Sequence, residues 1–168
     1  MSAQGTLMAF DHIVAGCRAM LEAVPEDRLD WRPHEKSWTL GELATHIAMI
    51  PNWTMPTLTM SEFDIDPEDG GPPPNPELGS SAELVAALDQ SAAAARASIE
   101  STSDETFAST WTMLVGGEPR FTMPKAVVLR SFILDHLIHH RAQLGVYLRL
   151  LDVPVPQSFG PTADFPDM

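Results

Sequence analysis

Apolar residues recur at helical spacing in four stretches of the chain, and these stretches predict four long helices. The first covers residues 4–23, the second begins at Thr39, the third covers residues 80–101 and the fourth covers residues 124–151. Within each, apolar positions lie three, four or seven residues apart, which gathers them on one side of a helix. Alternating strand and helix patterns are absent, which argues against a barrel or a doubly wound α/β fold. The pattern therefore predicts an all-α protein, an antiparallel four-helix bundle.

The second helix carries its own start and interruption signals. Thr39 and Glu42 have the spacing of a capping box, in which each side chain bonds to the backbone of the other. Pro51 cannot donate a hydrogen bond to the Ile47 carbonyl, so we expect a kink just beyond His46.

Residues 61–79 lack helical periodicity and are rich in carboxylates, glycine and proline. They predict a long loop between the second and third helices. A long loop in a compact domain is often a lid or a wall of a site. A weaker signal, residues 111–115 and 120–123 around Gly116-Gly117, predicts a small hairpin.

Composition narrows the choice of partners. The 168 residues suit one domain, residues 1–168, and carry 10 Lys and Arg against 23 Asp and Glu, for a formal charge of -13. Nucleic acids and anionic membranes require clustered cations, so we expect neither as a partner. No apolar run approaches the roughly 20 residues of a membrane span, and the N-terminus lacks a signal-peptide pattern. Cys17 alone excludes an internal disulfide, and we expect a cytoplasmic protein.

Three histidines fall on apolar helix faces and are the main candidates for chemistry. His46 stands in the apolar stripe of the second helix, and His136 and His140 lie one turn apart on the apolar side of the fourth. Such imidazoles are either satisfied within the core or bind a cation together. His139 falls towards the rim of that face. The chain has no His-Glu-x-x-His zincin motif and no paired Glu-x-x-His segments of di-iron proteins.

Other side chains near these histidines have two readings each. Gln143, on the same face as His136 and closer to the C-terminus, either bonds to the site or fills the core. Trp53 and Phe132 either wall a pocket or pack in the core. Arg141 and Arg149 point away from the apolar side, so we expect both at the surface.

Two segments resemble the DinB/YfiT-like superfamily. Residues 31–33 (Trp-Arg-Pro) and 36–47 (Lys-Ser-Trp-Thr-Leu-Gly-Glu-Leu-Ala-Thr-His-Ile) resemble its second-helix entry. Residues 135–149, which read Asp-His-Leu-Ile-His-His-Arg-Ala-Gln-Leu-Gly-Val-Tyr-Leu-Arg, resemble its fourth-helix signature. The sequence departs from the family at Ala142, where glycine is common.

The resemblance implies a bundle that holds one divalent metal, zinc or nickel, through His46, His136 and His140. It implies no ligand role for His139. Three neutral imidazoles leave coordination positions open, which is typical of catalytic sites. Relatives include thiol S-transferases, a thiol-dependent isomerase and proteins described as metal-dependent hydrolases. We therefore expect a thiol-dependent S-transferase acting on a small molecule with a low-molecular-weight thiol. The alternatives are a metal-dependent hydrolase and a non-catalytic metal-binding bundle.

The fourth helix also predicts an interface. Leu134 and Ile138 fall on the side opposite the histidines, beside small residues, and need cover. Another helix of the same chain or a second copy can provide it. Because members of the resembled family are often dimeric, we expect a homodimer.

Overall fold

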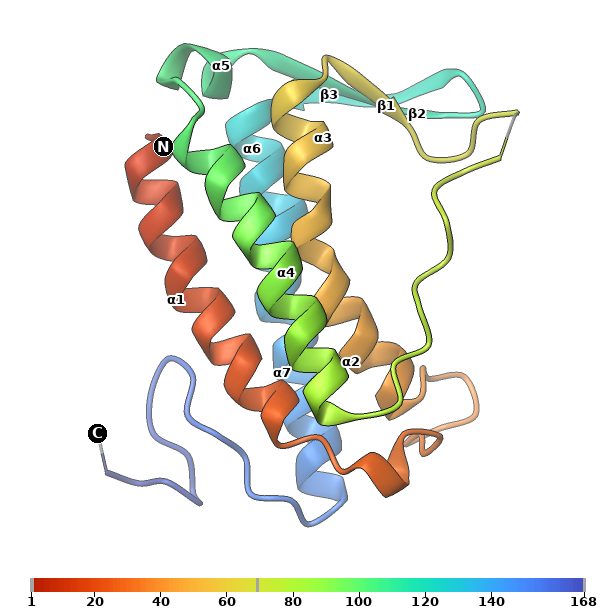
Figure 1. Ribbon diagram of the computed structural model, residues 1–168, viewed down its shortest axis with the longest axis vertical. Helices are drawn as coiled ribbons and strands as arrows, with labels where there is room; N and C mark the ends of the chain where they lie inside the picture. The colour runs from red at the N-terminus through yellow and green to blue at the C-terminus, as the bar shows by residue number, and fades with distance from the viewer. Residues whose placement is uncertain (1, 69, 168) are drawn as a thin grey trace.

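The computed structural model describes residues 2–68 and 70–167, so Asp69, within the predicted loop, lies outside the description. A bundle of helices forms the body, and a small sheet lies across one end of it (Figure 1). The α-helices are α1 (Ala3–Glu22), α2 (Leu40–Met49), α3 (Thr54–Thr59), α4 (Ser81–Glu100), α5 (Asp104–Ala108), α6 (Lys125–Leu129) and α7 (Asp135–Leu150). Short turns of other helical types are η1 (Glu26–Arg28), η2 (Ile50–Trp53) and η3 (Arg130–Leu134). The strands are β1 (Glu62–Asp64), β2 (Thr110–Val115) and β3 (Glu118–Pro124).

The four predicted helices are confirmed as α1, α2 with α3, α4, and α6 with α7. Their apolar sides meet in one core, and α4 packs against both α1 and α2. Fully buried members of this core include Leu21, Leu43, Leu88, Leu137 and Leu144. The apolar stripes thus bury as the periodicity requires, and they bring α2 and α7 together.

The start and interruption of the second helix are also confirmed. Thr39 Oγ1 accepts from the Glu42 N–H at 3.1 Å, and Glu42 Oε2 accepts from the Thr39 N–H at 2.7 Å. Helix α2 ends at Met49, and the 3₁₀ turn η2, which contains Pro51, connects it to α3. Both features fix the position of His46 along α2.

The fourth helix is less uniform than its sequence predicts. Residues Arg130–Leu134 form a π-helical turn, in which the Asp135 N–H donates to the Arg130 carbonyl five residues earlier. The Arg130 guanidinium reaches the Asp135 carboxylate at 2.9 Å across this wider turn. A π-turn adds a residue to one helical turn and often occurs at functional sites. Here it lies immediately before the first histidine of α7.

An all-α description is incomplete, because a three-stranded sheet of order β1-β2-β3 is present. The predicted hairpin forms as the antiparallel pair β2 and β3, with Gly116 and Gly117 at φ 60° and 79° in the turn. Strand β1, which the sequence treated as loop, pairs in parallel with β2. Asp64 at its end accepts hydrogen bonds from the N–H groups of Gly116 (3.1 Å) and Gly117 (2.6 Å).

The predicted apolar patch opposite the histidines is largely covered within the chain. Leu134 is fully buried in the core, and Ile138 is half-buried beside the C-terminal segment around Val155. For Leu134 the cover comes from the same chain, one of the two alternatives that the sequence left open, because η3 and α1 pack together there. Val146 and Leu150, further along α7, remain 58% exposed each.

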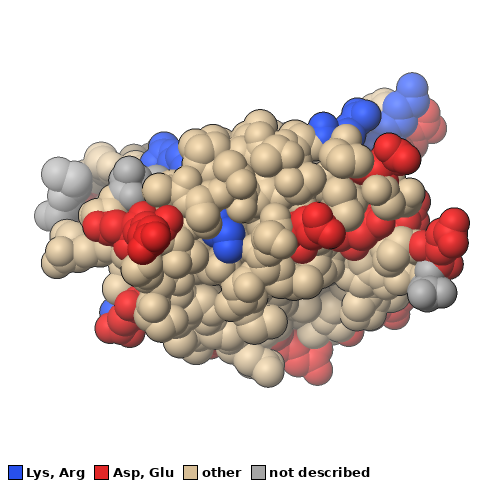
Figure 2. All heavy atoms as spheres, turned by 90° about the horizontal axis from the view of Figure 1, so that it is seen from above, with Lys and Arg blue, Asp and Glu red and all other residues tan. Residues whose placement is uncertain are grey.

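The surface is mixed in character. Figure 2 shows mostly uncharged residues over one end of the molecule, with acidic side chains in several separate places and basic side chains gathered at one corner. Among the described residues, no helix combines the length and apolar character needed to cross a bilayer.

Candidate metal site

The structure brings His46 of α2 together with His136 and His140 of α7. One ring nitrogen from each lies within 4.8 Å of the others. The Nε2 atom of His136 is 3.3 Å from Nε2 of His46 and 2.8 Å from Nε2 of His140. His140 is buried and the other two rings are half-buried. Three imidazoles from two helices therefore present Nε2 to a common point.

The second nitrogen of two of these rings is held by an acceptor. Nδ1 of His136 lies 3.3 Å from the Phe132 carbonyl oxygen, and Nδ1 of His140 lies 2.7 Å from Oε1 of Gln143. Both partners are oxygens that only accept, so each neutral ring carries its proton on Nδ1. Its Nε2 then presents a lone pair. Two such lone pairs 2.8 Å apart have no hydrogen to share, and a cation between them resolves the contact.

The donor set fits a divalent metal. Zinc bound tetrahedrally at about 2.0–2.1 Å separates two ligand nitrogens by about 3.3 Å. The His46–His136 separation is 3.3 Å. The His136–His140 separation of 2.8 Å is short of that value by about half an ångström, which a small ring rotation removes. Among the described residues, no fourth His, Cys, Asp or Glu joins the cluster, so coordination positions remain for water or substrate.

Electrostatics keep the three rings neutral. Burial, followed by the neighbouring His140 and His136, lowers the pKa of His46 to about 4. Burial is also the largest cause that lowers the pKa of His136 and of His140. Metal ligation requires the deprotonated imidazole, so these rings are in the binding form at neutral pH.

His139 stands apart from this cluster, as the sequence predicts. It is exposed on α7, and its ring centroid lies 4.7 Å from that of His140. It is not in the group whose nitrogens converge.

Sequence reasoning missed Trp38 as part of the site. Its ring stacks on His140 with centroids 5.5 Å apart and meets His46 edge-on at 4.9 Å. The Tyr147 hydroxyl donates to the Trp38 carbonyl at 3.2 Å, which ties this segment to α7. Trp38 precedes the Thr39 cap in the segment that resembles the family entry, but no helical periodicity extends to it.

The predicted aromatic walls lie elsewhere. Trp53 packs edge-on against Phe63, and Phe132 stacks on Phe121 with centroids 5.0 Å apart. Of the two, only Phe132 touches the histidines, through its carbonyl.

Cys17 on α1 and the two arginines of α7 have different surroundings. Cys17 is fully buried, and burial raises the pKa of its thiol to about 12, as expected of a packing residue. Arg141 is only 3% exposed, so its prediction as a surface group is wrong. Its guanidinium donates to the Ile13 carbonyl at 3.4 Å and lies 4.4 Å from the Phe159 ring centroid. Arg149 is exposed, as predicted, and pairs with Asp164.

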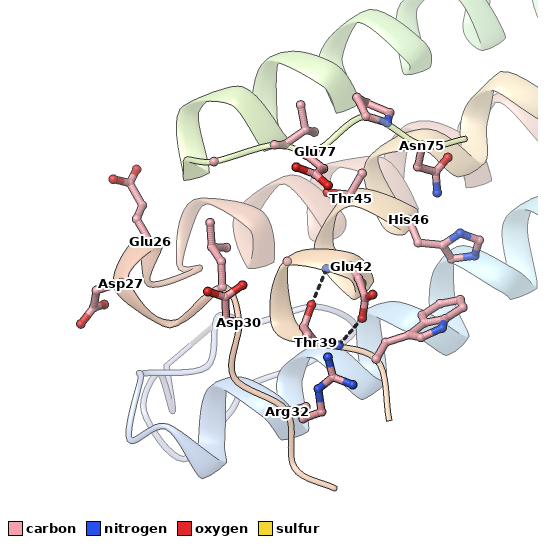
Figure 3. A pocket seen from close by; sticks show the side chains of 16 residues that line it. Glu26, Asp27, Asp30, Arg32, Thr39, Glu42, Thr45, His46, Asn75 and Glu77 are labelled. Atoms are coloured by element: carbon pink, nitrogen blue, oxygen red, sulfur yellow. Dashed lines mark hydrogen bonds between the residues drawn. The ribbon is translucent and has the colours of Figure 1, made fainter. Parts of the chain in front are cut away.

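A cavity of about 910 Å³ opens beside His46 (Figure 3). Its walls come from η1 and the segment that follows, from α2, and from residues 75–79. The last of these belong to the predicted acidic loop, so that loop does form a wall of the cavity.

Comparison with known proteins identifies the family. The DinB superfamily profile matches residues 9–144, and the chain belongs to this superfamily. None of the curated proteins matches it.

Solved structures show the same fold. A DinB-like protein from Bacillus cereus ATCC 10987 is 20% identical with a TM-score of 0.70, and the match covers 94% of this chain and 98% of that one. A DinB-like protein of Bacillus subtilis, YjoA, is 16% identical with a TM-score of 0.69, covering 92% and 96%. Bacillus subtilis YfiT is 14% identical with a TM-score of 0.65, covering 89% and 87%. YfiT is described as a probable metal-dependent hydrolase with an unusual four-helix bundle topology.

Proposed function

We propose that this chain is a metal-dependent enzyme that acts on a small molecule, with one divalent cation, zinc or nickel, held by His46, His136 and His140. The observation that carries the proposal is the pair of facing Nε2 atoms on His136 and His140, 2.8 Å apart, with both Nδ1 atoms already bonded to acceptors. If the two histidines were hydrogen-bonded to each other, one of these Nε2 atoms would carry a hydrogen. A cation bound by both Nε2 atoms explains the short distance without that hydrogen.

The surroundings favour catalysis over a sealed structural site. Three nitrogen ligands leave room for exchangeable partners, and the large cavity beside His46 gives a small molecule access. A divalent metal held by these three histidines would lower the pKa of bound water and polarise carbonyl groups. Gln143 and the Phe132 carbonyl hold the rings of His140 and His136, and Trp38 stacks on the ring of His140.

Hydrolysis is the reaction that the cavity supports best. Carboxylates line it, including Asp30, Glu42 and Glu77, and their negative charge opposes the approach of thiolates and anionic thiols. Water approaches such a surface without penalty, and carboxylates can accept its proton. The likeness to YfiT agrees with this choice. Thiol-dependent S-transfer, which the sequence placed first, becomes the second candidate and rests on the family resemblance.

A paired assay tests the proposal. Tag-free protein is stripped with a chelator, reloaded with zinc or nickel, and assayed on aryl esters and amides without thiol. The same protein is then assayed on an aryl halide with cysteamine, cysteine or glutathione. We expect thiol-independent hydrolysis that requires metal, disappears in His140→Ala and persists in His139→Ala. Turnover only with a thiol would move the assignment to S-transfer. Turnover unchanged by chelation and by His140→Ala would contradict metal-dependent catalysis.

A further inference from the structure

The cavity beside His46 is lined by more carboxylates than the hydrogen bonds of the fold use. Five carboxylates line it: Glu26, Asp27, Asp30, Glu42 and Glu77. Arg32 is the one lysine or arginine among the described residues of the lining. A hollow lined by one sign of charge concentrates ligands of the opposite sign.

Two of these carboxylates already have structural partners. Glu26 accepts from the backbone N–H and the hydroxyl of Ser81, both at 3.1 Å, at the start of α4. Glu42 completes the capping box with Thr39. Figure 3 shows this pair of bonds and places Glu26 and Asp27 at the side of the cavity away from His46.

Asp30 and Glu77 have no such structural partners. Neither makes a hydrogen bond or ion pair to a side chain within the part of the chain that the structure describes. They come from opposite walls, Asp30 from the segment after η1 and Glu77 from the segment before α4. Two carboxylates on facing walls are suited to one cationic group between them.

Thr45 is an independent sign of a ligand in the same cavity. Its residue is only 5% exposed, yet it belongs to the lining, one position before His46 on α2. Its hydroxyl has no hydrogen-bond partner among the described residues, whereas Thr57 and Thr59 on α3 each donate to the carbonyl four residues earlier. The hydroxyl is not among the fully buried atoms without a partner, so it is open to the cavity and free to bond to a ligand there.

Trp38 completes a recognition surface for cations. It lines the cavity and also contacts both His46 and His140. The face of an indole attracts ammonium groups, more strongly where they lose water. Carboxylates, a hydroxyl acceptor and an indole are therefore combined on the approach to the candidate metal site.

We propose that this cavity binds a small organic cation, an alkyl- or arylalkylammonium. Its charged group lies between Asp30 and Glu77 and donates to the Thr45 hydroxyl, and the remainder of the molecule points towards His46. As a statement about substrate, the inference rests on the proposed function. As a statement about binding, it stands on the cavity alone.

The test uses three compounds of similar size and different charge. Zinc-loaded protein is titrated by calorimetry with 2-phenylethylammonium, 2-phenylethanol and 3-phenylpropionate. We expect the cation to bind at least about tenfold more tightly than the alcohol and the anion to bind most weakly. Added salt at about 0.5 M should remove most of the advantage of the cation, because screening weakens exposed charges. An alcohol that binds as tightly as the cation, a tighter anion, or no binding of the cation would overturn the proposal.

Substitutions locate the binding site. Asp30→Asn with Glu77→Gln should reduce cation affinity to about that of the alcohol, and Thr45→Val should reduce it by about three- to tenfold. Asp30 and Glu77 are exposed, so their amide variants should fold normally. Glu105→Gln, at an exposed position on α5 outside the cavity, is the matched control and should change nothing. Equal affinity in the double variant and the control would refute the assignment.

Failure here is distinguishable from failure of the proposed function. Cation binding that persists in His140→Ala, with no metal-dependent turnover of any compound in the wild type, would retain this inference and remove the enzyme. Metal-dependent turnover of neutral or anionic compounds, with no cation binding, would do the reverse.

Discussion

Gln143 lies one helical turn after His140 on α7, and its side-chain oxygen is 2.7 Å from Nδ1 of that ring. This contact fixes which nitrogen carries the proton and leaves Nε2 available as a ligand. Gln143→Leu should therefore lower metal affinity by about 10- to 100-fold. Gln143→Glu, which keeps an acceptor oxygen, should retain most of it. The measurement is competition with a chromogenic zinc chelator, and equal affinities of wild type and Gln143→Leu would show that Gln143 only fills space.

The depressed pKa of His46 predicts a pH dependence of stability in the metal-free protein. Its folded value is about 4, and the ordinary value is 6.5. Between these values the unfolded chain binds the extra proton, so stability falls as the pH drops from about 6.5 towards 4. His46→Gln should remove this part of the loss.

Urea unfolding of chelator-treated protein at about pH 7 and pH 5 measures the effect. His136 and His140 also have a lowered pKa and lose stability in the same pH range, so the comparison with His46→Gln is essential. An identical pH-dependent loss in both proteins would contradict the assigned shift.

The buried Arg141 depends on a glycine in the facing helix. A methyl group at Gly16 would lie 2.4 Å from Nη1 of Arg141, whose guanidinium is held against Phe159. Gly16→Ala should destabilise the protein by about 1–2 kcal/mol, despite the better helix propensity of alanine. Gly5→Ala, where the added methyl group would lie 3.4 Å from Ser2 Oγ, is the matched control and should be neutral or stabilising. Thermal unfolding that ranks the two variants equally would refute this packing argument.

Local sequence signals predict some features of the site and not others. The placement of His136 and His140 on one face of α7 follows from helical spacing, and the position of His46 follows from its apolar stripe and the Thr39 cap, because these signals are local. The burial of Arg141 could not be predicted in the same way, since the space for it is made by Gly16 on another helix. The position of Trp38 at the site was not predicted, because Trp38 lies before the helix and reaches the histidines through the fold of its segment.

The sheet likewise has one part that the sequence predicts and one that it does not. The β2–β3 hairpin has a local turn signal at Gly116 and Gly117, and it was predicted. Strand β1 pairs with β2, about 50 residues away, with Glu62 opposite Thr112. Residues 61–79 contain no local signal for such a long-range pairing. The π-turn of η3 likewise has no periodicity signal, because one added residue barely alters the apolar pattern around it.

We expect a dimer that uses the outer side of α7. The contact would involve residues closer to the C-terminus than Leu134 and Ile138, which the sequence suggested. Val146 and Leu150 are each 58% exposed on one side of the helix, close to exposed Phe159 of the C-terminal segment. Val146→Glu should convert a dimer to a monomer that keeps its metal, because Val146 faces away from the histidines. Val127→Glu, at an exposed valine on α6, is the control and should remain dimeric. Sedimentation that shows a monomeric wild type at high micromolar concentration would end this proposal.

X-ray absorption of tag-free, zinc-loaded protein measures the coordination of the metal by these histidines. We expect one zinc per chain with three imidazole nitrogens at about 2.0–2.1 Å. Zinc should be lost in His46→Ala, His136→Ala and His140→Ala and retained in His139→Ala, whose exposed ring lies outside the cluster. Zinc bound with fewer than three imidazoles, or lost equally in His139→Ala and His140→Ala, would contradict it.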